Sequence, residues 1–423
     1  MKKFLANYSY PIIFVFILLL LLPSTIGKPA LTNTRAIITG MSIDKIENEY
    51  SIALQLITPQ SNISNNEDLE IVDDKGETIF ECFNNLSIKL GKVVGLEHAN
   101  IIILSDSLQN EDIMNLFDYL YRNTKITLST ILIQTDKSAQ SLLEASAELN
   151  NNSSSSLQNN LGFSNKIIES SKATTLGDFY NDYFSFSKIS TLPFIKTSSN
   201  EANSSTSESS SGKNSSSTST DGASSSSQQN SSGDTKSPVQ PLVQNNGEIS
   251  IYKEGRLVDR FTKDISVGLG WLQEDATIGV IKVENVTDNK YFDNSTVVVQ
   301  IEHSKTKVKS KIKDNKLIYD ININIYCIVS EVIDTFQNNK ILQNSQNYLN
   351  YELKEKIKDK VINDINATLL VSKEKKLDVF KIFDTFYKYH KNEFKIFLSK
   401  IDNSENYLEY VEFNINPNIY AYK

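Results

Sequence analysis

A serine-rich tract from about Thr197 to Pro238 constrains the folding of this 423-residue chain more than any other feature. The tract contains almost no large apolar side chain, so it cannot bury enough surface to offset the conformational entropy that ordering removes. We therefore predict a disordered linker or loop insertion at residues 197–241. About 40 such residues span roughly 35 Å on average. The folded parts must lie on either side, in lengths that suit two or three domains.

The first 28 residues have the features of an export signal. Lys2 and Lys3 precede an uninterrupted apolar run, Ile12 to Leu22, which is short for a membrane span and typical of a signal-peptide core. At about −0.3 to −0.6 kcal/mol per residue, insertion of this run is worth roughly −3 to −6 kcal/mol. Two outcomes stay open, cleavage after Gly27 or retention of residues 1–28 as an anchor. We predict that the rest of the chain lies outside the cytoplasm.

Residues 29–149 are predicted to form an N-terminal α+β domain, and residues 150–196 a small middle domain. Apolar side chains alternate from Tyr50 to Leu56, with the period of a half-buried strand. A strand, a turn and a second strand are predicted within 35–58, the second strand at 49–58. Further strands are predicted at 99–104 and 126–134, and helices at 79–90, 109–122 and 138–149. The alternation of strands and helices predicts a βαβ unit with a right-handed crossover.

Residues 242–423 are predicted to form a C-terminal α+β domain, a mainly antiparallel sheet packed by long helices. The clearest strand has apolar residues at every second position from Tyr319 to Val329, opposite a polar row of Asp320, Asn322, Asn324 and Tyr326. Further strands are predicted at 249–253, 279–286, 296–303 and 410–419, and helices at 341–369 and 379–386. The chain is therefore predicted to be α+β, with three mixed α/β domains.

The sequence contains no motif for catalysis or for binding nucleic acid. A formal net charge of −8 gives no general attraction to nucleic acid, and no Gly-rich phosphate loop, nucleophile elbow or zinc motif is present. The three histidines are far in sequence from one another and from the cysteines, Cys82 and Cys327. We predict no cofactor, no metal and no enzymatic activity. For the two cysteines, a disulfide and two buried free thiols both stay open.

Five lysines recur at every second position: Lys305, Lys307, Lys309, Lys311 and Lys313. If this segment is a strand, all five ammonium groups lie on one face. One interpretation is a basic stripe that faces anionic lipid headgroups or an acidic partner, worth about 1 kcal/mol per lysine near a membrane. The other is a solvated edge strand whose lysines prevent pairing with other sheets.

Several blocks of the sequence follow one another in a recognisable order. The first two are RAIITGMSIDKIENEYSIALQLITP and KVVGLEHANIIILSDSL, with His98 ahead of the apolar strand. The third is DFYNDYFSFSKISTLPFI, and the fourth, ISIYKEGRLVDRFTKDISVGLGWL, contains a G-L-x-W-L pattern. Glu331 ends the alternating strand, and Asp378 to Phe380 form a D-V-F. In order and spacing the blocks resemble the Ger(x)C family of spore germination proteins; the G-L-x-W-L residues are Gly268, Leu269, Trp271 and Leu272.

The resemblance implies a fold of three α+β domains and a place on the outer face of the inner spore membrane. It also implies two partners, the integral-membrane A-type and transporter-like B-type subunits of a nutrient germinant receptor. Members of this family have no known catalytic residues, so none are assigned here. We therefore expect a non-catalytic, membrane-associated subunit that acts in spore germination. The sequence does not identify the germinant or a contact with it.

The chain departs from the family at its N-terminus, where PSTIGKP replaces the lipobox and the first cysteine is Cys82. Thioether lipidation is therefore excluded at that place. An uncleaved N-terminal helix is the expected anchor, and secretion as a free protein is the other outcome. The serine-rich tract is an insertion between the third and fourth blocks. These two departures favour an alternative, an exported surface scaffold or adhesin-like protein without a germination role.

Overall fold

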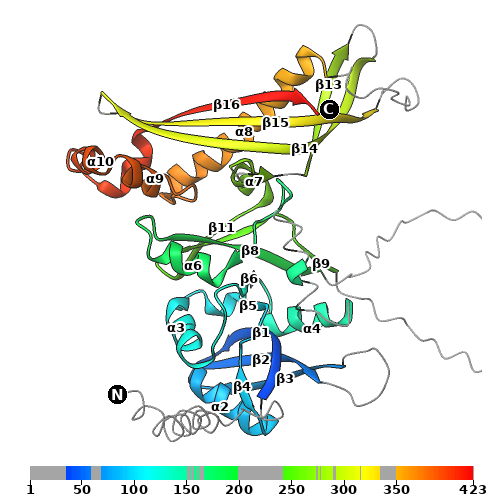
Figure 1. The fold of residues 1–423 in the computed structure, drawn as a ribbon, viewed down its shortest axis with the longest axis vertical. Coiled ribbons are helices and arrows are strands. Elements are labelled where there is room, and N and C mark those ends of the chain that lie inside the picture. Colours follow the sequence, from blue (N-terminus) through cyan, green and yellow to red (C-terminus); the bar gives the residue numbers. More distant parts are fainter. Residues whose placement is uncertain are drawn as a thin grey trace, which may run out of the picture.

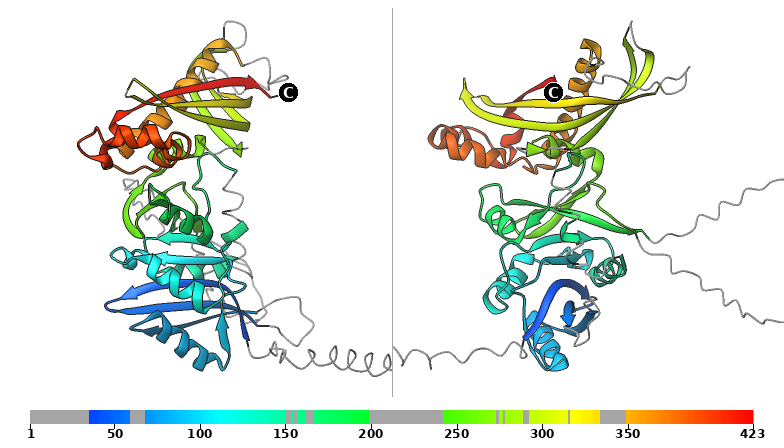
Figure 2. Two further views of the ribbon diagram at one scale, coloured as in Figure 1. Left: turned by 60° about the vertical axis from the view of Figure 1, so that its left-hand side comes forward. Right: turned by 45° about the vertical axis from the view of Figure 1, so that its right-hand side comes forward.

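The computed structural model describes residues 35–58, 68–149, 154, 157–159, 161, 166–198, 242–272, 275–276, 278–288, 292–314, 316–333 and 349–422. The predicted signal or anchor lies outside these residues, as does the serine-rich tract from residue 199 onward. Thr197 and Ser198, predicted to belong to the disordered linker, instead end strand β8 (Ile189–Ser198) and pair with β9 (Leu242–Gln244). The described residues form an elongated molecule with two sheets. One sheet lies towards each end of the long axis (Figure 1), and views from two further sides show the same separation (Figure 2).

The first sheet has eleven strands among the described residues, in the order β11-β10-β8-β6-β5-β1-β2-β3, with β4, β7 and β9 at its sides. Its central strands β1, β5, β6 and β8 are parallel, and its outer pairs are antiparallel. The strands are β1 (Arg35–Ile46), β2 (Glu49–Thr58), β3 (Asp68–Gly76), β4 (Val93–Gly95), β5 (Ile101–Ser105), β6 (Ile131–Thr135), β7 (Thr174–Thr175), β8 (Ile189–Ser198), β9 (Leu242–Gln244), β10 (Ile249–Lys253) and β11 (Arg256–Phe261).

Helices cover both faces of the first sheet. On one face pack α2 (Ile79–Leu90), α3 (Ile113–Asn123) and α6 (Leu176–Tyr183), and on the other packs α4 (Ala139–Leu149). Strand β5 is buried on both faces, which explains why its sequence is continuously apolar. Side-chain caps start three of these helices, because Thr78, Asp112 and Thr175 each accept a hydrogen bond from a backbone amide of the first turn.

The second sheet is mainly antiparallel, in the order β12-β14-β15-β16, with β13 beside β14. Only the pair β15–β16 is parallel among its described strands. The alternating apolar side chains of β15 face the long helix α8 and form one core with Leu353, Ile357, Val361 and Ile365. The elements are α7 (Lys263–Trp271), β12 (Asp275–Ala276), β13 (Gly279–Asp288), β14 (Phe292–Lys313), β15 (Lys316–Ile333), α8 (Tyr351–Lys375), α9 (Ile382–Tyr389), α10 (Lys391–Leu398) and β16 (Val411–Ala421).

The α+β class predicted from the sequence is confirmed, and the βαβ unit is β5–α3–β6. Strand β6 begins at Ile131, five residues later than predicted, because residues 126–130 form a turn. The strand predicted at 296–303 and the lysine segment at 305–313 belong to one strand, β14. Long helices were predicted to pack the C-terminal sheet, but among the described helices beside that sheet only α8 is long. The beginning of the helix predicted at 341–369 lies outside the described residues.

The strands that follow the serine-rich tract belong to the first sheet. Strand β10 pairs with β8, and β11 pairs with β10. The two sheets therefore divide after Phe261, whereas the predicted C-terminal domain begins at residue 242. The pairing joins segments from both sides of the tract into one sheet. The domain boundaries themselves stay a prediction.

Candidate interaction surface and the junction beside it

The second sheet has one face that no described helix covers. Side chains of β14 alternate between the core face, where Val308 and Ile312 pack, and the opposite face. The five lysines predicted to share a face do so, and each is exposed. At about 3.4 Å per residue, the row spans roughly 27 Å. We call this side of β14, β15 and β16 the open face.

Asparagines extend the lysine row across the neighbouring strands. Lys305 and Lys307 lie opposite Asn324 and Asn322 on β15. These asparagines in turn lie opposite Asn418 and Asn416 on β16, and Asn418 Nδ2 donates to Asn324 Oδ1 at 3.3 Å. The middle of the open face, around Lys305 and Lys307, is therefore polar on all three strands, whereas Ile318 lies opposite Lys311 nearer the hairpin end.

Few carboxylates offset the charge of the open face. Between Lys305 and Lys316 it has six lysines and two carboxylates, Asp320 and Glu412. With Asp275 of β12, which lies opposite Lys305, the formal charge is +3. Asp320 accepts from Lys311 at 2.6 Å and from Asn414 at 2.8 Å, and these hydrogen bonds hold its pKa below the usual range. Within the described part of the chain, no carboxylate lies within ion-pair distance of the four other stripe lysines, Lys305, Lys307, Lys309 and Lys313.

Aromatic rings close one end of the open face. Tyr326 stacks between His303 on β14 and Tyr420 on β16, with ring centroids 5.9 and 5.2 Å apart. Tyr420 is 44% exposed. Tyrosine side chains combine an apolar ring with a polar hydroxyl, which suits a boundary between water and a less polar medium.

The edge-strand interpretation applies to part of the lysine row. Among the described residues, β14 pairs only with β15 from Thr306 to Lys313, so this length has an open edge. His390 covers part of it, because His390 Nε2 lies 2.8 Å from the Ser310 carbonyl oxygen and donates to it. Lys305, in contrast, pairs with Asp275 of β12 on one side and Asn324 on the other. Protection of an edge therefore does not account for Lys305.

Helix α7 forms the junction between the two sheets, and it contains most of the G-L-x-W-L residues. A methyl group on Gly268 would lie 2.8 Å from the Asp364 carbonyl oxygen and collide with Thr368 on α8. A methyl group on Gly270 would collide with the backbone of Ile168, whose carbonyl carbon would be 2.8 Å away. The two glycines therefore let α7 approach its neighbours on both sides at backbone distance.

Trp271 fixes α7 on the second sheet. Its ring is 2% exposed, and Nε1 donates to Asp364 Oδ2 at 3.1 Å. Lys360 pairs with the other oxygen of Asp364 at 2.5 Å, so this buried carboxylate is satisfied on both sides. Thr306 of β14 donates to the Trp271 carbonyl oxygen at 2.6 Å. Leu269 packs towards the first sheet, and Leu272 packs against the core of the second.

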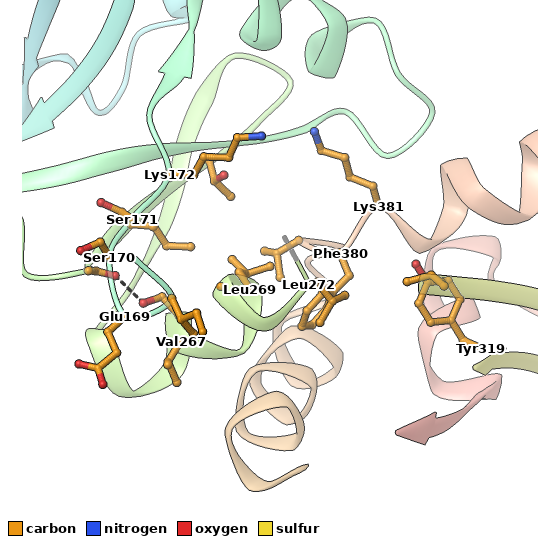
Figure 3. Close-up of a pocket in the computed structure, with 18 residues that line it drawn as sticks. Glu169, Ser170, Ser171, Lys172, Val267, Leu269, Leu272, Tyr319, Phe380 and Lys381 are labelled. Atoms are coloured by element: carbon orange, nitrogen blue, oxygen red, sulfur yellow. Dashed lines mark hydrogen bonds between the residues drawn. The ribbon is translucent and has the colours of Figure 1, made fainter. Parts of the chain in front are cut away.

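A cavity of about 360 Å³ lies beside α7 at this junction (Figure 3). Val267, Leu269, Leu272 and Phe380 give it apolar walls, and Ser170 and Ser171 also line it. The side chains of Lys172 and Lys381 extend towards each other across the cavity in Figure 3. Its volume falls within the range of about 300–1,000 Å³ that small-molecule pockets occupy.

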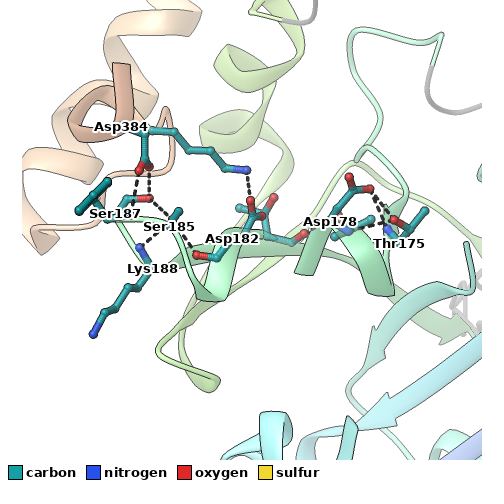
Figure 4. A network of polar contacts seen from close by, with 11 residues as sticks. Thr175, Asp178, Asp182, Ser185, Ser187, Lys188 and Asp384 are labelled. Carbon is teal, nitrogen blue, oxygen red and sulfur yellow. Dashed lines mark hydrogen bonds and ion pairs between the residues drawn. The ribbon is translucent and has the colours of Figure 1, made fainter. Parts of the chain in front are cut away.

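Polar contacts join α9 to the first sheet on one side of the junction (Figure 4). Asp384 accepts from the Phe186 amide at 2.9 Å and from the Ser187 hydroxyl at 2.6 Å. Lys381 pairs with Asp182 of α6. Burial raises the pKa of Asp182, and the nearby ammonium group of Lys381 opposes that rise. Together these contacts hold the two sheets at one relative position.

The other residues singled out from the sequence lie apart from these features. His98 is exposed on the turn before β5, and Glu331 is exposed near the end of β15. Cys82 and Cys327 are buried free thiols in the cores of different sheets. Burial raises the pKa of each thiol to about 12, so both are protonated at neutral pH.

The sequence predicted the lysine row and the polar row of β15, but not that the two lie side by side or that β16 extends them. The asparagines of β16 pair in register with β15 through a parallel contact that joins positions about 94 residues apart, as in Asn324 and Asn418. The alternation of apolar and polar residues in β15 was the signal that indicated its polar row on the open face. Asp364, Asp384 and Asp182 gave no signal, because their partners come from distant segments.

No three or more of the histidine, cysteine, aspartate and glutamate side chains in the described segments form a group that could hold a metal ion. Within the same segments, no helix combines the length and the apolar composition of a membrane span.

Comparison with known proteins places both halves of the chain in one class, the spore germination proteins. Residues 31–197 match the family model "Spore germination protein N-terminal domain", and residues 247–421 match "Spore germination B3/ GerAC like, C-terminal". The two matches lie on either side of the serine-rich tract and together span most of the chain. The chain belongs to the family of GerC-type germinant receptor subunits.

Two individual proteins are similar over most of their length. Spore germination protein KC of Bacillus subtilis (strain 168) is 21% identical over 384 residues, which are 87% of this chain and 84% of that protein. A solved structure, "Crystal Structure of the GerBC protein", has a TM-score of 0.49 at 16% identity and covers 91% of this chain and 97% of that one.

Proposed function

We propose that this chain is a non-catalytic, membrane-associated subunit of a nutrient germinant receptor, acting with integral-membrane A-type and B-type subunits. The observation that most supports the proposal is the match of both halves of the chain to germination-family models, on the two sides of the serine-rich tract. In this proposal the working parts are surfaces, the open face and the α7 junction.

The proposed location is the outer face of the inner spore membrane, with residues 1–28 as the anchor. The apolar run from Ile12 to Leu22 supports this location, because it supplies enough insertion energy to enter a bilayer. In the absence of a lipobox cysteine, this run takes the role that a lipid anchor has in the related lipoproteins.

Fractionation of spores tests the location and the partners together. Membranes of the spore core are extracted with detergent, the chain is captured, and its N-terminal peptide and associated proteins are identified by mass spectrometry. We expect an intact N-terminal peptide and two co-purifying integral-membrane proteins of the A and B types. A full-length chain recovered from the soluble fraction, without those partners, would contradict the proposal.

A further inference from the structure

We infer that the open face of β14, β15 and β16 is a docking surface for an anionic lipid membrane. The inference rests on the membrane association proposed above and adds the surface through which the second sheet makes contact. Its basis is a row of cations on β14. Lys305, Lys307 and Lys309 are exposed at alternate positions with no carboxylate partner among the described residues.

The charge of the open face is local and opposes that of the whole chain. The chain has a formal net charge of −8, whereas the open face together with Asp275, which lies opposite Lys305 on β12, has six lysines and three carboxylates, a charge of +3. One of these carboxylates, Asp320, already accepts hydrogen bonds from Lys311 and Asn414. A positive face on a negative protein attracts an anionic surface in one orientation and repels it in the others.

The composition of the open face favours lipid headgroups over a protein. Interfaces between proteins have apolar or aromatic anchors at the centre and are depleted in lysine. Here the centre consists of the lysines of β14 and of asparagines on the neighbouring strands, Asn322 and Asn324 on β15 and Asn416 on β16. A headgroup layer needs only distributed positive charge and hydrogen-bond donors, and both are present along roughly 27 Å of β14. The aromatic cluster of His303, Tyr326 and Tyr420 lies at the end of the row.

Amine footprinting on the unmodified chain tests the inference directly. The full-length chain is reconstituted into vesicles of phosphatidylglycerol or of phosphatidylcholine and treated briefly with an acetylating reagent. Mass spectrometry then gives the modification rate of each lysine. We expect Lys305, Lys307 and Lys309 to react at least fivefold more slowly on the anionic vesicles than on the neutral ones. The protection should disappear in 1 M salt, where the Debye length falls to about 3 Å.

Two substituted chains with equal net charge distinguish the effect of the open face from the effect of the total charge. Lys305, Lys307 and Lys309 are changed to Glu in one, and the exposed lysines Lys92, Lys125 and Lys166 of the first half are changed to Glu in the other. At about fivefold per lysine, the first change should weaken the contact on the order of 100-fold. Lys311 and Lys313 should then lose their protection on anionic vesicles, whereas in the second chain they should keep it.

The outcomes distinguish this inference from the proposed membrane association. A chain that does not float with any vesicle contradicts the association itself. A chain that floats while Lys305, Lys307 and Lys309 react equally on both kinds of vesicle overturns the docking surface alone. Protection that appears only on addition of extracted spore membrane proteins, and not on phosphatidylglycerol, overturns it in favour of a protein partner.

Discussion

At the scale of single residues, the family signature of this chain is explained by packing. Gly268 and Gly270 are the positions where α7 touches the backbone of α8 and of the segment at Ile168. Trp271 supplies the buried ring and the hydrogen bond to Asp364 that hold the helix in place. No reaction is needed to explain why these residue types stand here. Their role is to set the distance between the two sheets.

The substitution Gly270→Ala should therefore destabilise the junction. The added methyl group would overlap backbone atoms of Ile168, which cannot move as a flexible side chain can. We expect a loss of about 1–3 kcal/mol of unfolding free energy, measured by urea denaturation. Gly177→Ala in α6 is the matched control, because its methyl group would lie 3.2 Å from the Leu128 carbonyl oxygen and needs only a small shift. Equal stability of the two variants would contradict the packing account.

At the scale of elements, the sequence predicted best where one local pattern decides the structure. The strict alternation of β15 reflects a buried and an open face, and it identified the strand. The full length of β14 was not predicted, because its second half is dominated by exposed lysines and has only two large apolar side chains, Val308 and Ile312. The place of β10 and β11 in the first sheet could not be predicted, because it depends on pairing with β8 across the serine-rich tract.

The start of α9 shows how the D-V-F pattern acts. Asp378 is buried, and its two oxygens accept from the amides of Ile382 and Phe383 at 2.9 and 2.8 Å. This carboxyl group thus satisfies two amides of the first turn that would otherwise lack partners. Burial raises the pKa of Asp378 to about 6, against the opposing effect of its hydrogen bonds.

The raised pKa of Asp378 predicts a pH dependence of stability. Its pKa is about 6 in the folded chain and 3.8 without the fold, so the folded state binds the proton more tightly. The stabilisation that comes from the proton on Asp378 is complete below about pH 4 and is lost as the pH rises through 6. It is worth on the order of 2–3 kcal/mol of unfolding free energy. The substitution Asp378→Asn should remove that decline from urea titrations at pH 4 to 7. Parallel curves for the two chains over this range would show that the carboxyl group does not titrate there.

At the scale of the whole molecule, the two sheets are held by α7, by Ile168 and by the contacts of α9. The Ile168 amide donates to the Ile278 carbonyl oxygen at 2.9 Å, which places Ile168 in the core of the second sheet. Asp384 and Lys381 join α9 to the turn between α6 and β8 and to α6. These contacts therefore join the sheet at one end of the molecule to the sheet at the other end.

Removal of the α9 contacts should loosen the sheets without unfolding either one. In the double variant Asp384→Ala and Lys381→Ala, we expect hydrogen exchange at residues 185–188 and 382–386 to become about tenfold faster, because the hydrogen bonds across the junction are lost. Exchange within β5 and β15 should stay unchanged. Asp178→Ala is the control, because it removes only the capping box of α6. An effect of the same size at residues 382–386 in the control would contradict the assignment.

Nutrient-triggered germination of a deletion strain tests the central claim most directly. Spores that lack this chain are complemented with the unmodified chain, with the variant in which Lys305, Lys307 and Lys309 are changed to Glu, or with the control variant at Lys92, Lys125 and Lys166. The account predicts loss of germination with at least one nutrient, restored by the unmodified and control chains and not by the open-face variant. Normal germination of the deletion strain in every nutrient would contradict the receptor role and favour an exported scaffold.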